Sequence, residues 1–208
     1  MGTSDIRVQV RALTVEDALA IEQVAGILVA GFAEHWPGSW PDLEAARAAV
    51  RASFGADRIS RVAVDEHGAV VGWIGGMAEY GGHVWQLDPL VVRPDSQGQG
   101  IGQALVADFE AQVRSRGGLT IWLGSDDVDG MTSLAGVDLF PHVLDHLARI
   151  RNLRRHPFEF YQKLGYAIVG ALPDANGLGK PDIFLAKSVA RRNPAPAVPA
   201  SLTSADQG

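Results

Sequence analysis

The stretch from His83 to Gln103 reads HVWQLDPLVVRPDSQGQGIGQ, and it decides the fold. It begins as an apolar strand, continues as a glycine-rich turn, and ends as the start of an amphipathic helix that Gly117 stops. In such a unit, the loop N–H groups and the helix N-terminus can converge on a phosphate. We therefore predict an anion site here, against the alternative of a glycine-rich turn that holds no ligand.

The glycine spacing excludes two common phosphate loops. A Walker A loop requires Gly-Lys-Ser/Thr, whereas Gly102 is followed by Gln-Ala. A dinucleotide fingerprint requires a glycine at its sixth position, which is Gln103 when Gly98 is the first. The run Gln97-x-x-Gly100-x-Gly102 instead resembles the Q/R-x-x-G-x-G/A signature of the GCN5-related N-acetyltransferases (GNAT). We interpret the turn as a pyrophosphate site of an acyl-coenzyme A enzyme.

Length and composition indicate one globular domain. The chain has 208 residues, of which 47% are hydrophobic, enough for a substantial core. We assign residues 1–190 to this domain. The segment 191–208, rich in proline, alanine and serine, is expected to be a disordered tail.

Net charge and amino-acid composition limit the classes of partner that the chain can have. The net charge is −6 and there is no lysine- or arginine-rich block, so no nucleic-acid partner is expected. An acidic balance is compatible with a cationic substrate. The chain contains no cysteine, which agrees with a reducing cytoplasm and excludes a cysteine nucleophile. No apolar run has the length of a membrane span, and the N-terminus lacks a signal-peptide pattern, so neither a membrane partner nor export is expected.

The periodicity of the remaining chain indicates an α/β (α+β) fold. Alternating or continuous apolar runs predict strands at 6–13, 61–65, 70–80, 84–92, 119–124, 166–171 and 183–187. Helical periods predict helices that begin near Thr14, at 42–54, at 100–116, at 144–154, and with Pro157 as first residue. The strand–loop–helix–strand unit around the glycine turn should place strands 84–92 and 119–124 side by side and parallel.

Pro89 lies inside the predicted strand 84–92, where it cannot donate a ladder hydrogen bond. The conflict disappears if the fourth and fifth strands splay apart at this point. The N–H groups of Leu90 and Val92 would then face a gap and could bind an extended pantetheine arm. The Leu90 N–H could also hold the oxyanion of a tetrahedral intermediate. The alternative is an ordinary bulge without a ligand.

Two side chains are candidates for proton transfer. An attacking amine must lose a proton, and Asp88 is the ionisable base candidate on the fourth strand. A departing thiolate needs a proton, and Tyr161 could donate one. Each residue also has a structural interpretation, because Asp88 could bond a backbone N–H beside Pro89, and Tyr161 could be a core residue with Phe158. Alternation predicts that Gln86, Asp88 and Leu90 share one face of the strand.

Three further groups of residues are candidates for the site. Trp36 and Trp40 lie on an irregular loop and either cover the core or wall a binding cleft. Three acidic residues follow strand 119–124 and either attract a cation or form a solvated turn: Asp126, Asp127 and Asp129. His142 and His146 have helical i, i+4 spacing but lack the glutamate of a HExxH zinc motif, so they are expected to be surface histidines, and no metal is predicted.

From Trp36 to Lys187 the chain is similar to the aminoglycoside 6'-N-acetyltransferases of the GNAT superfamily. The similarity is carried by WQLDPLVV, by GLTIWLGSDDVD, and by HPFEFYQKLGYAIVGALPDANGLGKPDIFLAK. It implies a GNAT fold: a mixed, strongly bent central sheet of about six to seven strands, helices on both faces, and splayed fourth and fifth strands. It also implies acetyl transfer from acetyl-CoA to the 6'-amine of a cationic aminoglycoside antibiotic, in direct attack within a ternary complex, often by a homodimer.

The resemblance assigns roles by position. The coenzyme site falls on Leu90, Val91, Val92, Gln97, Gly98, Gln99, Gly100, Ile101, Gly102 and Gln103, and the thiolate-side tyrosine falls on Tyr161. The drug-contacting positions fall on Trp36, Tyr80, Gln86, Asp127 and Asp129. Two positions depart from the family, which carries glutamate in place of Gln86 and histidine in place of Asp88. Other acceptors, such as a polyamine or a peptide N-terminus, and a low-turnover protein that binds acetyl-CoA or the drug, are the alternatives.

Overall fold

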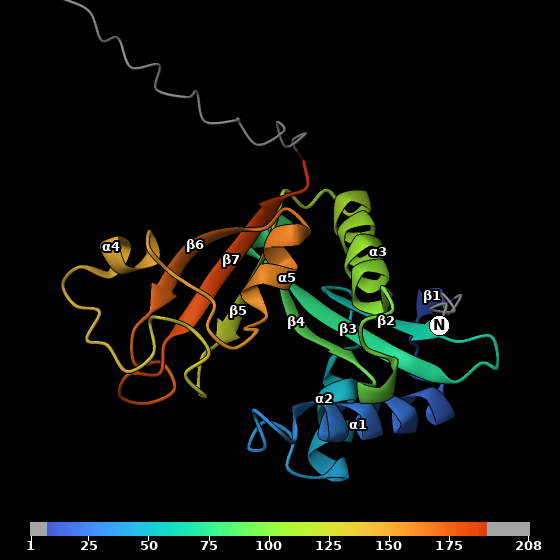
Figure 1. The fold of residues 1–208 in the computed structure, drawn as a ribbon. Coiled ribbons are helices and arrows are strands. Elements are labelled where there is room, and N and C mark those ends of the chain that lie inside the picture. The colour runs from blue at the N-terminus through green and yellow to red at the C-terminus, as the bar shows by residue number, and fades with distance from the viewer. Residues whose placement is uncertain (1–7, 191–208) are drawn as a thin grey trace, which may run out of the picture.

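The computed structural model describes residues 8–190 and contains one seven-stranded mixed sheet, with strand order β1-β2-β3-β4-β5-β7-β6 (Figure 1). The strands are β1 Gln9–Ala12, β2 Arg58–Val64, β3 Val70–Glu79, β4 Val84–Val92, β5 Thr120–Asp126, β6 Ala167–Leu172 and β7 Asp182–Ser188. Only the β4–β5 pair is parallel among these neighbours. The sheet is bent, because β5, β7 and β6 turn away from β1–β4 (Figure 1).

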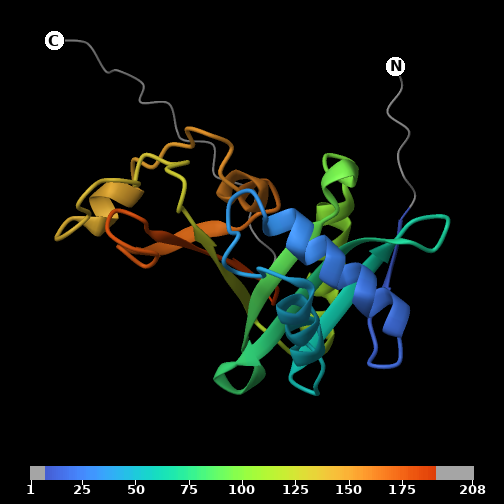
Figure 2. The same cartoon turned by 90° about the horizontal axis from the view of Figure 1, so that it is seen from below.

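Helices cover both faces of the sheet (Figures 1 and 2). They are α1 Ala18–Phe32, α2 Leu43–Ala52, α3 Ile101–Ser115, α4 Val143–Leu147 and α5 Phe158–Lys163, with short 3-10 turns η1 Tyr80–Gly82 and η2 Pro94–Ser96. One core cluster joins α1 and α2 to the sheet around Leu28 and Trp73. The other joins α3 and α5 to the opposite face around Phe109 and Tyr161. The predicted fold is confirmed.

Two helix boundaries differ from the sequence-based prediction, each for a local reason. The helix expected at 144–154 is reduced to Val143–Leu147, because the chain then turns at Ile150 to pair Asn152 with Thr132. Pro157 is the N-cap of α5 instead of its first residue. The tail assigned to 191–208 lies outside the described residues. Within residues 8–190, no helix is both long and apolar enough to cross a membrane.

A β-bulge in β4 accommodates Pro89. Leu90 pairs with Ile74 and Leu87 with Gly76, so Asp88 and Pro89 together oppose the single residue Gly75. The extra residue inverts the alternation: Trp85 and Leu87 lie in the core cluster with α3, whereas Val91 lies in the cluster with α1. The prediction that Gln86, Asp88 and Leu90 share one face is therefore wrong, because it assumed an unbroken strand.

Parallel pairing of β4 with β5 covers only Val84–Gln86 against Thr120–Trp122. Beyond this point β5 pairs with β7 on its other side, and β4 pairs with β3. The two strands therefore separate just before Asp88, as the proline predicted. This gap positions the candidate site.

Gly76 permits the close approach of β3, β4 and α3. A Cβ at this position would overlap the Gln86 carbonyl oxygen and the Phe109 ring. We expect Gly76→Ala to lower the free energy of unfolding by about 3 kcal/mol, since backbone and a packed ring must move. Gly26→Ala in α1 is the control, because its Cβ meets nothing within 4 Å, and it should be neutral or stabilise by about 0.5–1 kcal/mol. Urea unfolding measures the free energy of unfolding of both variants, and equal changes in the two would contradict the packing argument.

Candidate functional site

The splay exposes one edge of β4. The Arg93 N–H donates to Val71 O on β3 at 2.9 Å. Backbone polar groups alternate along a strand, so the Val91 N–H also faces β3, whereas the N–H groups of Leu90 and Val92 face the gap where β5 has diverged. Two N–H groups spaced in this way match the carbonyls of an extended ligand that lies in the gap as a pseudo-strand.

The glycine loop continues directly from this edge. Gly98 (φ 77°) and Gly100 (φ 79°) both adopt left-handed backbone, and Gly100 is the N-cap of α3. A Cβ at either position would meet nothing within 4 Å, so the space beside the loop is open. Gln97 Nε2 donates to Val92 O at 3.3 Å and ties the loop to the end of β4. The open loop and the N-terminus of α3 suit a phosphate group, as the motif predicted.

A pocket of about 220 Å³ lies where β4 and β5 separate. Aromatic residues of α1 and the loop that follows it form one wall, β4 and its bulge form the floor, and β5 with α5 forms the other wall. The lining residues include Trp36, Trp40, Asp88, Leu90, Asp126 and Tyr161. Trp36, Asp88, Leu90 and Tyr161, all predicted as site residues, are thus brought together in one pocket.

Asp88 projects from the bulge with its carboxylate open to the solvent of the pocket. The surrounding pocket walls, and secondarily the negative charge of Asp126, raise the pKa of the Asp88 carboxyl. A raised pKa makes an ionised carboxylate more basic. Asp88 is therefore suited to accept a proton, and it has no positively charged partner among the described ion pairs.

Tyr161 lies on α5 across the pocket. It is 8% exposed, and its ring packs against the rings of Phe160 and Tyr166. Burial, and secondarily the nearby Asp88 carboxylate, raise the pKa of the Tyr161 phenol well above its ordinary value. The hydroxyl therefore keeps its proton throughout the physiological range and can donate it as a hydrogen bond or to a strong base.

His156 positions the end of β5 against α5. The ring is 1% exposed, and its Nδ1 accepts from the Phe158 N–H at 3.2 Å. This acceptor role places the ring proton on Nε2, which donates to the Asp126 carbonyl at 3.2 Å. Burial lowers the pKa of His156, so the neutral ring is favoured. His156 thus fixes the backbone on which Asp126 faces the pocket.

Three carboxylates lie at the end of β5 and in the acidic loop after it, and each has different surroundings. Asp126 lines the pocket and accepts from Asn176 Nδ2. Asp127 is fully buried, and its oxygens accept the N–H groups of Met131 (2.6 Å) and Thr132 (2.9 Å). Asp129 accepts from His35 Nδ1 at 2.7 Å. Asp127 therefore shapes the loop, and its assignment to substrate binding stays a prediction.

Asp182 on β7 adds a fourth carboxylate opposite Asp126. It packs on Gly124, where a Cβ would collide with its oxygens, and its buried Oδ1 has no hydrogen-bond partner among residues 8–190. Burial, and secondarily the charges of Asp126 and Asp88, raise its pKa to about 6. Ionised Asp182 is therefore unfavourable in the folded state at neutral pH.

We expect Asp182→Asn to stabilise the fold above pH 6. The folded-state pKa exceeds the unfolded value of 3.8, so wild-type stability falls as pH rises between these values and stays reduced above them. Asparagine carries no charge and removes this loss of stability. The free energy of unfolding should therefore rise by roughly 1–3 kcal/mol at pH 8 and change little at pH 3.5. Urea unfolding at the two pH values measures it, and a gain that is equal at both would contradict the raised pKa.

Comparison with known proteins identifies the family of the chain. The acetyltransferase (GNAT) family model matches residues 22–133, more than half of the chain. The chain belongs to the acetyltransferase (GNAT) family. The comparison with curated proteins gave no match.

Solved structures support the same family. An aminoglycoside 6'-N-acetyltransferase complexed with coenzyme A is 40% identical, has a TM-score of 0.80, and is matched over 88% of this chain and 98% of that chain. The aminoglycoside 6'-N-acetyltransferase from Enterococcus faecium is also 40% identical over the same shares, with a TM-score of 0.79. An aminoglycoside 6'-acetyltransferase type Ii is 34% identical over 88% of this chain and 99% of that chain, with a TM-score of 0.67.

In this GNAT fold, two predicted acceptor positions lie away from the pocket lining. Tyr80 is 79% exposed in the turn after β3. Gln86 lies on β4 at the last paired position before the splay, opposite Trp122. Trp122 Nε1 donates to Glu79 Oε2 at 2.7 Å, so a carboxylate lies on the neighbouring strand beside Gln86. The assignment of Tyr80 and Gln86 to the acceptor site stays a prediction.

Sequence reasoning missed Asp182 and His156 as site residues. It indicated Asp126 only as one of three acidic residues after the fifth strand, since nothing in its spacing distinguishes it from Asp127. Asp182 reaches the site through the antiparallel β5–β7 register, and His156 through its bond to the end of β5. The only sequence signal for Asp182 was its place in the KPDIF segment of the family resemblance.

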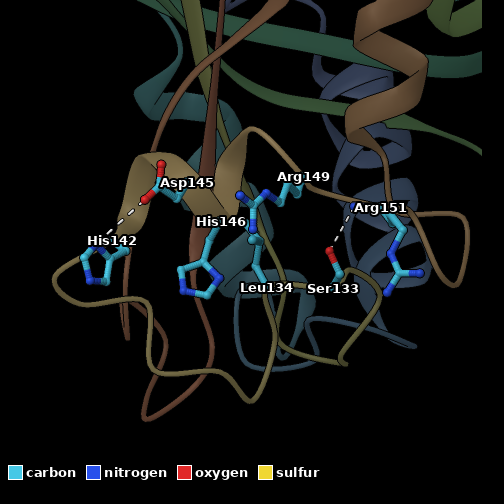
Figure 3. A pocket seen from close by; sticks show the side chains of 7 residues that line it. All are labelled: Ser133, Leu134, His142, Asp145, His146, Arg149 and Arg151. Atoms are coloured by element: carbon cyan, nitrogen blue, oxygen red, sulfur yellow. Dashed lines mark hydrogen bonds and ion pairs between the residues drawn. The ribbon is translucent and has the colours of Figure 1, made fainter.

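A second, larger hollow of about 630 Å³ lies on the segment around α4, away from the residues described above (Figure 3). Figure 3 shows His142, Asp145 and His146 at α4 on one side of the hollow, with Asp145 directed toward His142, and Arg149 and Arg151 on the other side. His142 pairs with Asp145 at 3.7 Å. Within residues 8–190 no group of three or more His, Cys, Asp or Glu side chains could hold a metal ion.

Proposed function

We propose that this chain transfers the acetyl group of acetyl-CoA to the 6'-amine of aminoglycoside antibiotics, by direct attack in a ternary complex. The observation that carries the proposal is the pocket at the β4–β5 splay, which unites Asp88, Leu90 and Tyr161 beside an open glycine loop. The 40%-identical structures that are named aminoglycoside 6'-N-acetyltransferases support the acceptor.

The chain's own groups suit each binding step. The glycine loop and the N-terminus of α3 would hold the pyrophosphate of the coenzyme. The N–H groups of Leu90 and Val92 would hold the pantetheine arm and the thioester. Aromatic side chains of Trp36 and Trp40 and the carboxylates of Asp126 and Asp129 would receive the hydroxyl-rich, polycationic acceptor.

The reaction is a balanced transfer. The acceptor nitrogen attacks the thioester carbon, forms the C–N bond, and passes a proton to Asp88, directly or through a water. The carbonyl oxygen becomes an oxyanion that the Leu90 N–H stabilises. As the oxyanion collapses, the C–S bond breaks, the coenzyme thiolate takes a proton from Tyr161, and the proton held by Asp88 returns to the Tyr161 oxygen, which restores both groups. No cysteine exists to carry the acetyl group, which favours direct attack over a cysteine acyl-enzyme.

We propose a cytoplasmic homodimer. Exposed apolar side chains gather on the half of the fold that contains α4 and β6, and they support a second copy of the chain as partner. They are Phe140, Leu144, Leu153, Val169 and Leu178. The absence of cysteine agrees with a reducing compartment.

The test of the proposed function is thiol release from acetyl-CoA with kanamycin, spermidine and a short peptide as acceptors. We expect rapid release with kanamycin and little with the other two. Release only with spermidine or the peptide would keep the acetyltransferase and change the acceptor. Tight binding of kanamycin without thiol release would favour a binding protein, an alternative that the glutamine at position 86 keeps open.

A further inference from the structure

One hydrogen bond joins the two loops that flank the pocket. His35 belongs to the segment 33–42 between α1 and α2, here called the aromatic loop, and Asp129 belongs to the acidic loop after β5. His35 Nδ1 lies 2.7 Å from Asp129 Oδ2, across 94 residues of sequence. We propose that His35 is a specificity-determining residue that occupies Asp129 in the free enzyme, and that an ammonium group of the acceptor displaces it. This inference rests on the proposed function.

The contact has the properties of an exchangeable one. A carboxylate only accepts hydrogen bonds, so His35 Nδ1 carries the proton and donates it whether or not Nε2 is also protonated. The His35 and Asp129 side chains are 34% and 45% exposed, respectively. Ion pairs with this exposure contribute little to stability, because water competes for both groups. A polycation that brings several ammonium groups to the pocket can therefore replace the imidazole.

The aromatic loop is otherwise held by ring packing. Trp40 and Trp36 lie 4.5 and 5.8 Å from the Phe32 ring at the end of α1, and the His35 ring lies 5.4 Å from Trp36. Trp36 Nε1 is buried and has no hydrogen-bond partner among residues 8–190. An unpaired indole N–H in the wall of the pocket is unfavourable until a ligand oxygen meets it. A hydroxyl-rich acceptor supplies that oxygen once the loop shifts.

Charge explains why Asp129 is the point of exchange. Asp88, Asp126 and Asp182 lie close together at the splay, and none of them pairs with a cation among the described ion pairs. Asp129 differs, because its N–H donor comes from the aromatic loop, whereas the donor to Asp126 is Asn176 of the β6–β7 turn. An arriving ammonium group therefore competes with His35 at Asp129, whereas the carboxylates at the splay accept no hydrogen bond from the aromatic loop.

The variant that tests the inference is His35→Phe, which keeps a ring against Trp36 and removes the N–H donor. We expect the Kd of kanamycin, measured by calorimetry, to fall about two- to fivefold, as removal of a competing exposed ion pair predicts. The KM should fall in parallel, and kcat should stay within about twofold. Asp129→Asn should weaken binding, and His35→Phe should then add nothing in the double variant. His35→Ala repeats the test without added apolar surface.

His67→Phe is the matched control, because His67 is an 81% exposed histidine on the β2–β3 turn, and its Kd should equal that of wild type. Tryptophan emission provides a second readout. Kanamycin should change the emission of both proteins as it reaches Trp36, and the change should be larger in wild type, where the imidazole must also leave Asp129.

A Kd that is unchanged or raised in His35→Phe overturns the inference, even when kanamycin is acetylated normally. Conversely, kanamycin that binds more tightly to His35→Phe but releases no thiol overturns the proposed function and leaves the displacement intact. Failure of kanamycin to bind either protein overturns both.

Discussion

Asp88→Asn is expected to lower kcat/KM for the amine acceptor by about 10²-fold or more, the loss typical when a general base is removed. Asparagine keeps the size and hydrogen-bonding geometry of the side chain but cannot accept the proton of the attacking amine. Because Asp88 is open to the pocket and is not part of either core cluster, the free energy of unfolding should change little. Steady-state thiol release at saturating acetyl-CoA measures the effect.

The pH profile identifies the role. In wild type, activity is lost as pH falls through the raised pKa of Asp88, because the protonated carboxyl is no longer a base. The variant lacks this acid limb, so the ratio of wild-type to variant rates is largest above that pKa and shrinks below it. Any pH dependence that comes from protonation of the acceptor amine is common to both proteins. Asp57→Asn, at an exposed aspartate before β2, is the control. Parallel profiles for wild type and Asp88→Asn would remove Asp88 as the base.

Tyr161→Phe is expected to lower kcat about 10- to 10²-fold, while the KM for acetyl-CoA changes little. The substitution removes only the hydroxyl, and the ring retains its packing against Phe160 and Tyr166. The raised pKa of Tyr161 keeps the phenol protonated, so wild type should show no basic limb from this residue up to about pH 10. Thiol release against pH measures both properties.

Tyr166→Phe is the matched control for Tyr161→Phe. Tyr166 is also buried, its ring lies 5.7 Å from that of Tyr161, and it does not line the pocket. Its loss should leave kcat within about twofold. Equal losses in the two variants would indicate that packing of this cluster, and not proton donation by Tyr161, supports turnover.

The splay could be predicted because it follows from one residue. Pro89 has no N–H to donate, so a strand that contains it must lose a partner at that point. The bulge could not be predicted from the same residue, since whether β4 opposes Gly75 with one residue or two depends on the β3–β4 register. That register decided which face carries Leu90.

Contacts between loops that are far apart in the chain could not be predicted from the sequence. The pairing of His35 with Asp129 depends on two irregular loops whose paths no periodicity describes. Asp127 and Asp129 look equivalent in the stretch SDDVD, yet one is buried by backbone N–H groups and the other faces the opposite wall. By contrast, the glycine loop could be located from spacing alone, because left-handed backbone at Gly98 and Gly100 requires glycine.

The most direct test of the account is thiol release with kanamycin compared with an analogue that carries a hydroxyl in place of the 6'-amine. Both acceptors retain the remaining ammonium groups and can occupy the acidic pocket. We predict rapid thiol release with kanamycin, and with the analogue no release above the rate of acetyl-CoA hydrolysis. Equal release with the two acceptors would contradict acetyl transfer to the 6'-amine at the β4–β5 splay.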